Sequence, residues 1–125
     1  MQLETIARNA LADAFDDIVN TGTGTAQFRL ETSGGTAVAT ISLQNPAFGA
    51  ASNGVITLQG TPLQDTNAAG GTVARGAIYN RNAARVSISN AATSGAEITV
   101  SSTTVGAGET VTLSSLTVTV PAGNP

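Results

Sequence analysis

The chain has 125 residues, of which only 10% are charged, against about 25% in a typical globular domain, and its formal net charge is −3. It contains no cysteine and no histidine, which excludes disulfides, zinc sites of the Cys/His kind and every catalytic triad that uses histidine. Its five basic residues are arginines scattered along the sequence, so nucleic acid is not an expected partner, and no apolar run reaches the ~18 residues of a membrane span.

An amphipathic helix is predicted over residues 3–19, where apolar residues recur at steps of three and four. Three aspartates, Asp13, Asp16 and Asp17, fall largely on its other side. We interpret them as a solvated face rather than a calcium site, because Ca²⁺ sites use loop oxygens and glycine turns. The apolar stripe must be buried, either within the subunit or between subunits, and the flexible residues 21–25 favour the second arrangement.

The chain therefore divides into an N-terminal helix with its cap, residues 1–22, and a β-domain, residues 23–125. Alternation of period two predicts a hairpin over residues 26–44. A connection with Asn45-Pro46 and Asn53-Gly54 then leads into a strand at residues 55–58. Phe48, inside this connection, is predicted to fill either the core or an interface.

The second half of the chain continues as strands separated by small polar turns. An edge strand is predicted at residues 63–65, and further strands at 72–79, 85–90, 96–105 and 109–120. The last of these loses its alternation at Ser114-Ser115, where an extra residue predicts a β-bulge. About eight strands at this spacing indicate a mainly β fold: a single antiparallel β-sandwich or jelly-roll-like domain with one N-terminal amphipathic helix.

Catalytic chemistry has few candidate residues. Asp65, Glu97 and Glu109 are carboxylates that could supply a glycosidase pair, but nothing in the sequence places two of them at the ~5–9 Å that such a pair requires. The glycine-containing segments 22–24 and 106–108 lack the spacing of a phosphate loop. We therefore expect neither an enzyme nor a bound cofactor or metal.

Three motifs carry a resemblance to a known group of proteins. They are Ala7-Arg8-Asn9-Ala10 in the helix, Asn45-Pro46-Ala47-Phe48-Gly49-Ala50-Ala51 with the trailing Asn53-Gly54-Val55, and the C-terminal segment 107–121. In this order they resemble a group of small structural proteins of tailed bacteriophages, and the resemblance covers most of the chain.

The resemblance implies a virion component, and within that class a head decoration (cement) protein. Such a protein is made in the cytoplasm of the bacterial host and is a homotrimer on the outer surface of the capsid. Its partners would be its own copies and the major capsid protein, with no nucleic acid, membrane or small-molecule substrate. The scarcity of charges is consistent with many copies packing on one shell, because like charges would repel.

Other functions remain open at this point. The chain could be a tail-associated or fibre-like virion protein, or a carbohydrate-binding or adhesin module, although the scarcity of aromatic residues weakens the last reading. The arginines of the second half could contact an acidic capsid surface or be ordinary surface residues. The candidate interface residues are Leu3, Ile6, Leu11, Phe15, Phe48, Arg75, Tyr79, Arg81 and Arg85.

Overall fold

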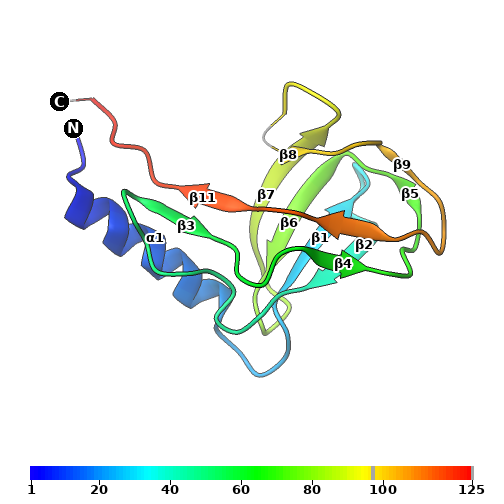
Figure 1. Cartoon of the computed structure of the whole chain (residues 1–125), viewed down its shortest axis with the longest axis horizontal. Helices are drawn as coiled ribbons and strands as arrows, with labels where there is room; N and C mark the ends of the chain where they lie inside the picture. The colour runs from blue at the N-terminus through cyan, green and yellow to red at the C-terminus, as the bar shows by residue number, and fades with distance from the viewer. Residues whose placement is uncertain (97, 125) are drawn as a thin grey trace.

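The structure is a computed structural model that describes residues 1–96 and 98–124, and in this part it is mainly β with one helix at the N-terminus (Figure 1). The elements in chain order are α1 (Thr5–Val19), β1 (Gln27–Glu31), β2 (Ala37–Ser42), β3 (Val55–Thr57), β4 (Leu63–Asp65), β5 (Gly71–Thr72), β6 (Arg75–Tyr79), β7 (Arg85–Ala92), β8 (Ile98–Thr99), β9 (Thr104–Val105), β10 (Val111–Leu113) and β11 (Thr117–Thr119).

The predicted helix is confirmed, beginning at Thr5 and ending at Val19. The backbone N–H of Asn20 donates to the Asp16 carbonyl at 2.9 Å, which closes the last turn. Gly22 follows with a φ of +124°, and a Cβ there would lie 2.5 Å from the backbone nitrogen of Asn82. The helix stop therefore requires glycine both for its conformation and for the close approach of the turn at Asn82.

A five-stranded sheet in the order β2-β1-β6-β7-β8 forms the main layer. β1 pairs antiparallel with β2 and with β6, so the predicted hairpin over residues 26–44 is confirmed, and β6 and β7, which overlap the strands predicted at 72–79 and 85–90, also pair antiparallel. β8 instead runs parallel to the end of β7. Within β1, Phe28 and Leu30 turn toward the core while Gln27 and Arg29 lie on the outer face, as the alternation predicts.

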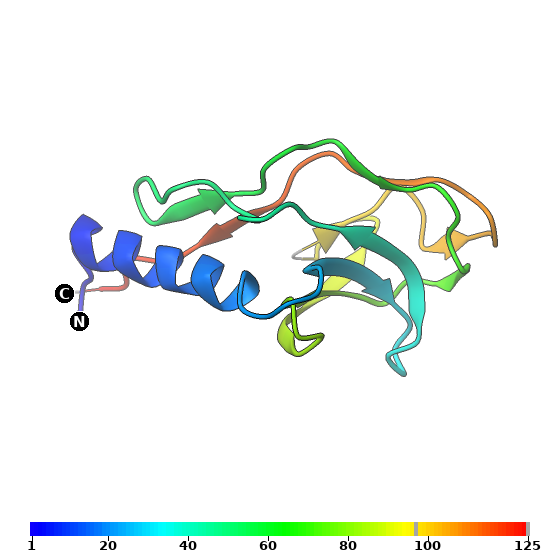
Figure 2. The ribbon, with the colours of Figure 1, turned by 90° about the horizontal axis from the view of Figure 1, so that it is seen from below.

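Three short strand pairs make up the rest of the β structure: β4 with β10, β3 with β11, and β5 with β9. The pair β3/β11 lies against α1 and the pair β4/β10 lies against the sheet, so the two pairs run along one side of the molecule (Figure 2). Both chain ends lie together beyond α1 (Figure 1), where Leu3 N–H donates to the Ala122 carbonyl at 2.7 Å.

An eight-stranded antiparallel sandwich is not confirmed, because the strands are shorter and fall into one curled sheet and three pairs. The predicted strand at residues 109–120 is two strands: β10 pairs with β4 and β11 pairs with β3. Ser114 and Ser115 lie between them, so the loss of alternation marks a change of pairing partner rather than a bulge within one ladder.

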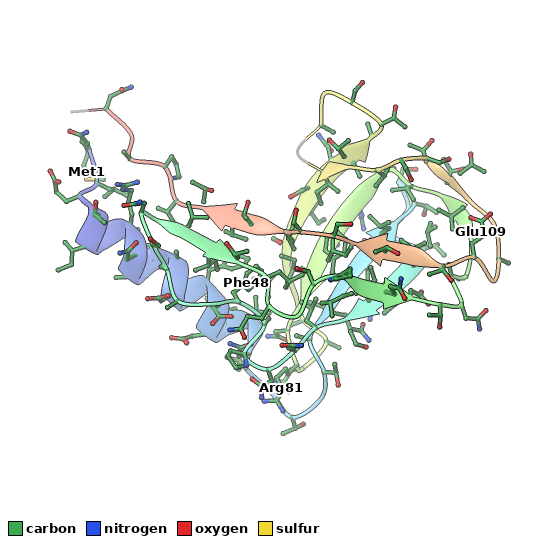
Figure 3. All side chains as sticks on the ribbon, in the orientation of Figure 1. Met1, Phe48, Arg81 and Glu109 are labelled. Carbon is green, nitrogen blue, oxygen red and sulfur yellow. The ribbon has the colours of Figure 1, made fainter. Side chains whose placement is uncertain are left out.

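The core lies between the sheet, the strand pairs and one side of α1. Its largest fully buried apolar side chains are Phe48, Ile41, Ile56, Val19 and Val38. Phe48 lies inside the molecule (Figure 3) and is 1% exposed. Its ring meets that of Phe15 edge to face with the centroids 6.2 Å apart. The connection that precedes β3 therefore supplies the side chain that joins helix and strands.

Candidate interaction surfaces

The polar side of α1 holds the connection between β2 and β3 through four side-chain oxygens. Each accepts a hydrogen bond from a backbone N–H of that connection. The pairs are Asn9 Oδ1 with Gly54 N–H at 2.8 Å, Asp13 Oδ1 with Ala51 N–H at 2.9 Å, Asp16 Oδ1 with Phe48 N–H at 3.1 Å, and Asn20 Oδ1 with Ala47 N–H at 2.9 Å. Other amides of this connection donate to backbone carbonyls, such as Gly49 N–H to Thr57 and Ser52 N–H to Val55, and the helix side chains accept from these four.

The helix ladder, which consists of the Asn9, Asp13, Asp16 and Asn20 side chains and their four backbone donors, corrects the interpretation of the three aspartates as a solvated face. Asp13 and Asp16 are acceptors for backbone amides, and only Asp17 keeps its carboxylate free of a hydrogen bond in the described structure. The spacing of Asn9, Asp13, Asp16 and Asn20 alternates steps of four and three, which places them on one face of a helix. That signal is present in the sequence, but the backbone N–H donors that these oxygens bind lie 27 to 45 residues further along the chain.

The ionised Asp16 carboxylate is destabilised in the folded protein. Desolvation by burial raises the pKa of this carboxyl above its ordinary 3.8, and the hydrogen bond from the Phe48 amide lowers the pKa by a smaller amount. A carboxylate near a helix C-terminus is also unfavourable. Because the pKa of Asp16 is higher in the folded protein than in the unfolded chain, protonation of this carboxyl adds to the free energy of unfolding. The contribution is complete below pH 3.8 and is lost as the pH rises through the folded-state pKa.

Asp16→Asn is therefore expected to raise the free energy of unfolding at pH 7 by on the order of 0.5 kcal/mol, the scale of a charge at a helix terminus. The amide oxygen still accepts from Phe48, and the charge is gone. Thermal unfolding at pH 7 and at pH 3 measures the effect, and the gain should vanish at the lower pH. Asp17→Asn removes a charge from the same helix end outside the ladder and is the matched control, so its gain measures the helix-terminus part, and a gain in Asp16→Asn no larger than this would contradict a contribution from desolvation.

The apolar stripe of α1 faces solvent in this subunit. Ile6 is 83% exposed, Ile18 is 52% exposed and Leu11 is 51% exposed. Leu3 is half-buried, and Phe15 packs partly against the core. Ala12 and Val19 supply the buried side of the helix instead. The helix thus binds its own domain through the polar ladder and a few small apolar contacts, and leaves its larger aliphatic side chains uncovered.

The outer face of the five-stranded sheet is built around one buried carboxylate. Glu31 is 0% exposed, and its Oε1 accepts from Arg75 Nε at 2.9 Å while its Oε2 accepts from the Tyr79 hydroxyl at 2.5 Å. The Glu31 carboxylate beside the phenol raises the pKa of Tyr79 above 10. The guanidinium of Arg29 lies over the Tyr79 ring, 4.1 Å from its centroid.

Arg85 adds a third guanidinium group to this face, since it is paired directly with Tyr79 across the ladder and is exposed. Ile88, paired with Ala77, is an exposed aliphatic side chain on the same face. Arg81 lies away from the face, at the hairpin turn (Figure 3), where its Nε donates to the Gly24 carbonyl at 2.9 Å. Of the three arginines predicted as interface residues, Arg75 and Arg85 lie on this face together with Arg29, and Arg81 does not.

Of the other predicted interface residues, Phe48 fills the core of the subunit, so the core interpretation of its ring holds and it offers no surface to a partner. Tyr79 is half-buried beneath Arg29. Arg29 and Ile88 were not among the predicted interface residues, because their pairing with Ala77 of β6 is a property of strand register and not of local sequence.

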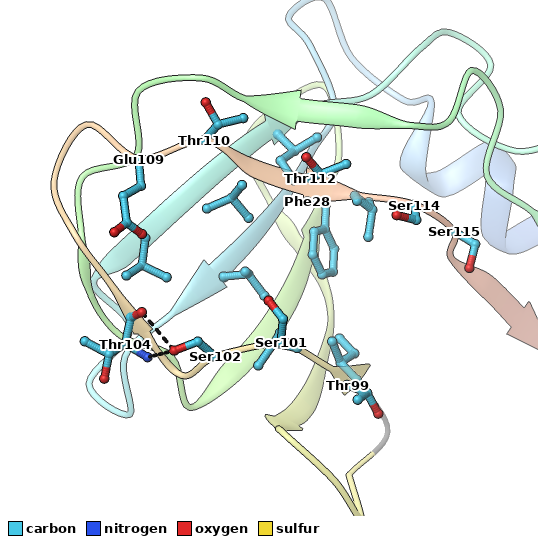
Figure 4. Close-up of a pocket in the computed structure, with 17 residues that line it drawn as sticks. Phe28, Thr99, Ser101, Ser102, Thr104, Glu109, Thr110, Thr112, Ser114 and Ser115 are labelled. Carbon is cyan, nitrogen blue, oxygen red and sulfur yellow. Dashed lines mark hydrogen bonds between the residues drawn. The ribbon is translucent and has the colours of Figure 1, made fainter.

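A groove of about 560 Å³ opens between the sheet and the strand pairs. Its floor is apolar and includes Phe28 and Leu30, and its two rims are the hydroxyl-rich segments 99–104 and 110–115, which face each other across Phe28 (Figure 4). Glu109 lies at one end of the groove and is the carboxylate among the residues that line it. No sequence signal pointed to this groove, because its rims come from segments that pair with different strands.

Both oxygens of Asp65, one of the acidic residues considered for catalysis, are engaged by backbone amides. Its Oδ2 accepts from Thr40 N–H of β2 at 2.8 Å, which ties β4 to β2, and its Oδ1 accepts from Asn67 N–H at 3.0 Å in the turn that follows β4. Glu97 lies outside the described residues. Among residues 1–96 and 98–124, no three acidic side chains gather as a cluster that could hold a metal ion.

Within the same ranges, no helix has the length and apolar character needed to cross a membrane. Comparison of the chain with protein-family models, with characterised proteins and with solved structures finds no match.

Proposed function

We propose that this chain is a structural protein of a bacteriophage particle, a head decoration protein that associates with its own copies and binds the outer surface of the capsid lattice. In this proposal the domain is a jelly-roll-like sandwich whose second layer consists of the strand pairs. The function requires surfaces for association and no reacting groups. The arrangement of charged and polar side chains in the described part of the chain is consistent with that requirement.

The observation that carries the proposal is the uncovered stripe of α1. Ile6, Leu11 and Ile18 are each at least half exposed, on a helix whose polar side is already hydrogen-bonded to its own domain. Fully burying one such side chain is worth about 1.5–3 kcal/mol, so a protein that leaves three exposed gains several kcal/mol when a partner covers them. The arginine face of the sheet supports a second contact, because arginine and tyrosine are enriched at the centres of interfaces.

Capsid binding tests this function. The purified protein is mixed with undecorated phage capsids, free and bound fractions are separated by sedimentation, and the thermal stability of the capsid is measured. The proposal expects saturable binding and a rise in the temperature at which the capsid opens. Absence of both would reject it.

A pair of variants ties that binding to the stripe. Ile6→Lys with Leu11→Lys should fold normally and bind at least about tenfold more weakly, the factor that 1.4 kcal/mol of lost burial corresponds to. Thr110→Lys is the matched control, since it adds a lysine at an exposed position on the groove rim. Equal binding by the stripe variant and by wild type would show that the stripe does not contribute.

A fibre-like or tail-associated protein is the alternative within the same class. It would share the self-association and lack the binding to heads, so the sedimentation experiment separates the two.

A further inference from the structure

Charged groups on this molecule are segregated between two surfaces. The helical region, residues 4–19, carries four carboxylates and one guanidinium group, which are Glu4, Asp13, Asp16, Asp17 and Arg8. The outer face of the sheet carries three guanidinium groups and one carboxylate, and that carboxylate, on Glu31, is fully buried. The first surface is therefore acidic and the second basic, within a chain whose net charge is only −3.

Each surface also presents uncovered apolar side chains beside its charges. On α1 these are Ile6, Leu11 and Ile18, with the exposed carboxylates of Glu4 and Asp17 on the same helix. On the sheet, Ile88 is exposed next to the arginine face. Apolar contact would supply affinity, and the opposite charges would supply orientation and a faster encounter.

We propose that α1 of one copy docks on the outer face of the five-stranded sheet of a second copy, with its acidic edges against Arg29 and Arg85. This inference rests on the self-association part of the proposed function. Two helices packed stripe to stripe would bring the carboxylates of both copies together, and two sheets packed face to face would do the same for the arginines. Like charges opposed across an interface cost several kcal/mol, so the helix-to-sheet contact is favoured.

The contact joins two different patches of the chain. Repeated with a rotation that divides a full turn it closes a ring, with any other rotation it builds an open filament, and made twice about a two-fold axis it forms a dimer. Each copy therefore uses both its helix and its sheet, with the same partner in the dimer and with two different neighbours in the ring or filament. A change confined to one patch therefore weakens every contact, and a complementary change on the other patch can restore them.

Charge reversal tests this pairing. The sheet variant is Arg29→Glu with Arg85→Glu, and it leaves the Glu31–Arg75 pair in place. The helix variant is Glu4→Lys with Asp17→Lys, and it leaves the ladder aspartates in place. Circular dichroism checks folding, and light scattering with analytical ultracentrifugation measures the mass of each variant and of an equimolar mixture. Glu109→Lys reverses a charge away from both surfaces and is the control.

We expect wild type and Glu109→Lys to associate, and more weakly at high salt. Each reversed variant alone should dissociate at least tenfold more readily, and the equimolar mixture should associate again through contacts between unlike variants. If either variant misfolds, the neutral changes Arg85→Gln and Asp17→Asn replace it, and each should weaken association by a smaller factor.

Four results would overturn the contact. They are a monomeric wild type, association unaffected in the sheet variant, association unaffected in the helix variant, and a mixture that stays monomeric. Capsid binding measured on the same samples separates the two proposals. A wild type that binds heads but stays monomeric, or whose association neither reversal weakens, would reject only the helix-to-sheet pairing, whereas failure of wild type to bind heads rejects the proposed function.

Discussion

Arg75→Ala is expected to lower the free energy of unfolding by about 3 kcal/mol, the lower end of the range for breaking a buried ion pair. The Glu31 carboxylate is fully buried, and Arg75 is its ionic partner in the described structure, with Tyr79 as its second hydrogen-bond donor. Removing the guanidinium leaves a buried negative charge without a counter-charge. The Arg75 side chain is itself 22% exposed, which is why we expect the lower end of the range. Urea unfolding followed by circular dichroism measures the change.

Two further variants distinguish the ion pair from a general effect of removing an arginine. Arg85→Ala removes an exposed guanidinium group on the same face and should change stability by no more than about 0.5 kcal/mol. Glu31→Leu with Arg75→Leu removes both charges, and should be more stable than Arg75→Ala because no buried charge is left uncompensated. Equal losses in Arg75→Ala and Arg85→Ala would contradict the structural role assigned to Glu31.

Phe48→Ala is expected to cost about 3–5 kcal/mol, the usual range for truncating a buried phenylalanine. The ring is 1% exposed and meets Phe15 of α1 edge to face. The backbone of residue 48 is held independently, because its N–H donates to Asp16 and its carbonyl accepts from Gln59 Nε2 at 3.1 Å. The substitution therefore removes the ring without removing the hydrogen bonds that place the connection.

Phe48→Leu retains most of the buried volume and should cost clearly less than Phe48→Ala. A double-mutant cycle with Phe15→Ala should give a coupling of about 0.5–1.5 kcal/mol between the rings. A loss below 1 kcal/mol in Phe48→Ala would place the ring outside the core and return it to the set of possible interface residues.

The parts of the fold that depend on local pattern could be predicted from the sequence. The helix followed from its period of 3.6, and the hairpin β1/β2 and the strands β6 and β7 followed from alternation, because both periods express which side of an element meets the core. Pairing between distant segments could not be predicted in this way. The alternation of residues 109–120 shows which side chains turn inward, but not that the chain changes partner from β4 to β3 at Ser114.

The interaction surfaces also depend on contacts between distant segments, which local sequence patterns do not predict. An apolar stripe at helical spacing normally marks the buried side of a helix, yet here the side that meets the domain is held by Asn9, Asp13, Asp16 and Asn20. Glu31 falls on the outward side of β1 by alternation and is nevertheless fully buried, because Arg75 and Tyr79 from the neighbouring strand reach it. In both cases the deciding groups lie more than 25 residues away in the sequence.

The most direct measurement is an image reconstruction of the phage particle at a resolution that distinguishes a helix from strands. The proposed function predicts this domain on the outer surface of the head, in repeated copies, with Ile6, Leu11 and Ile18 covered by a neighbouring chain. A head with no density for the domain, or copies whose helix stripe faces open solvent, would contradict it.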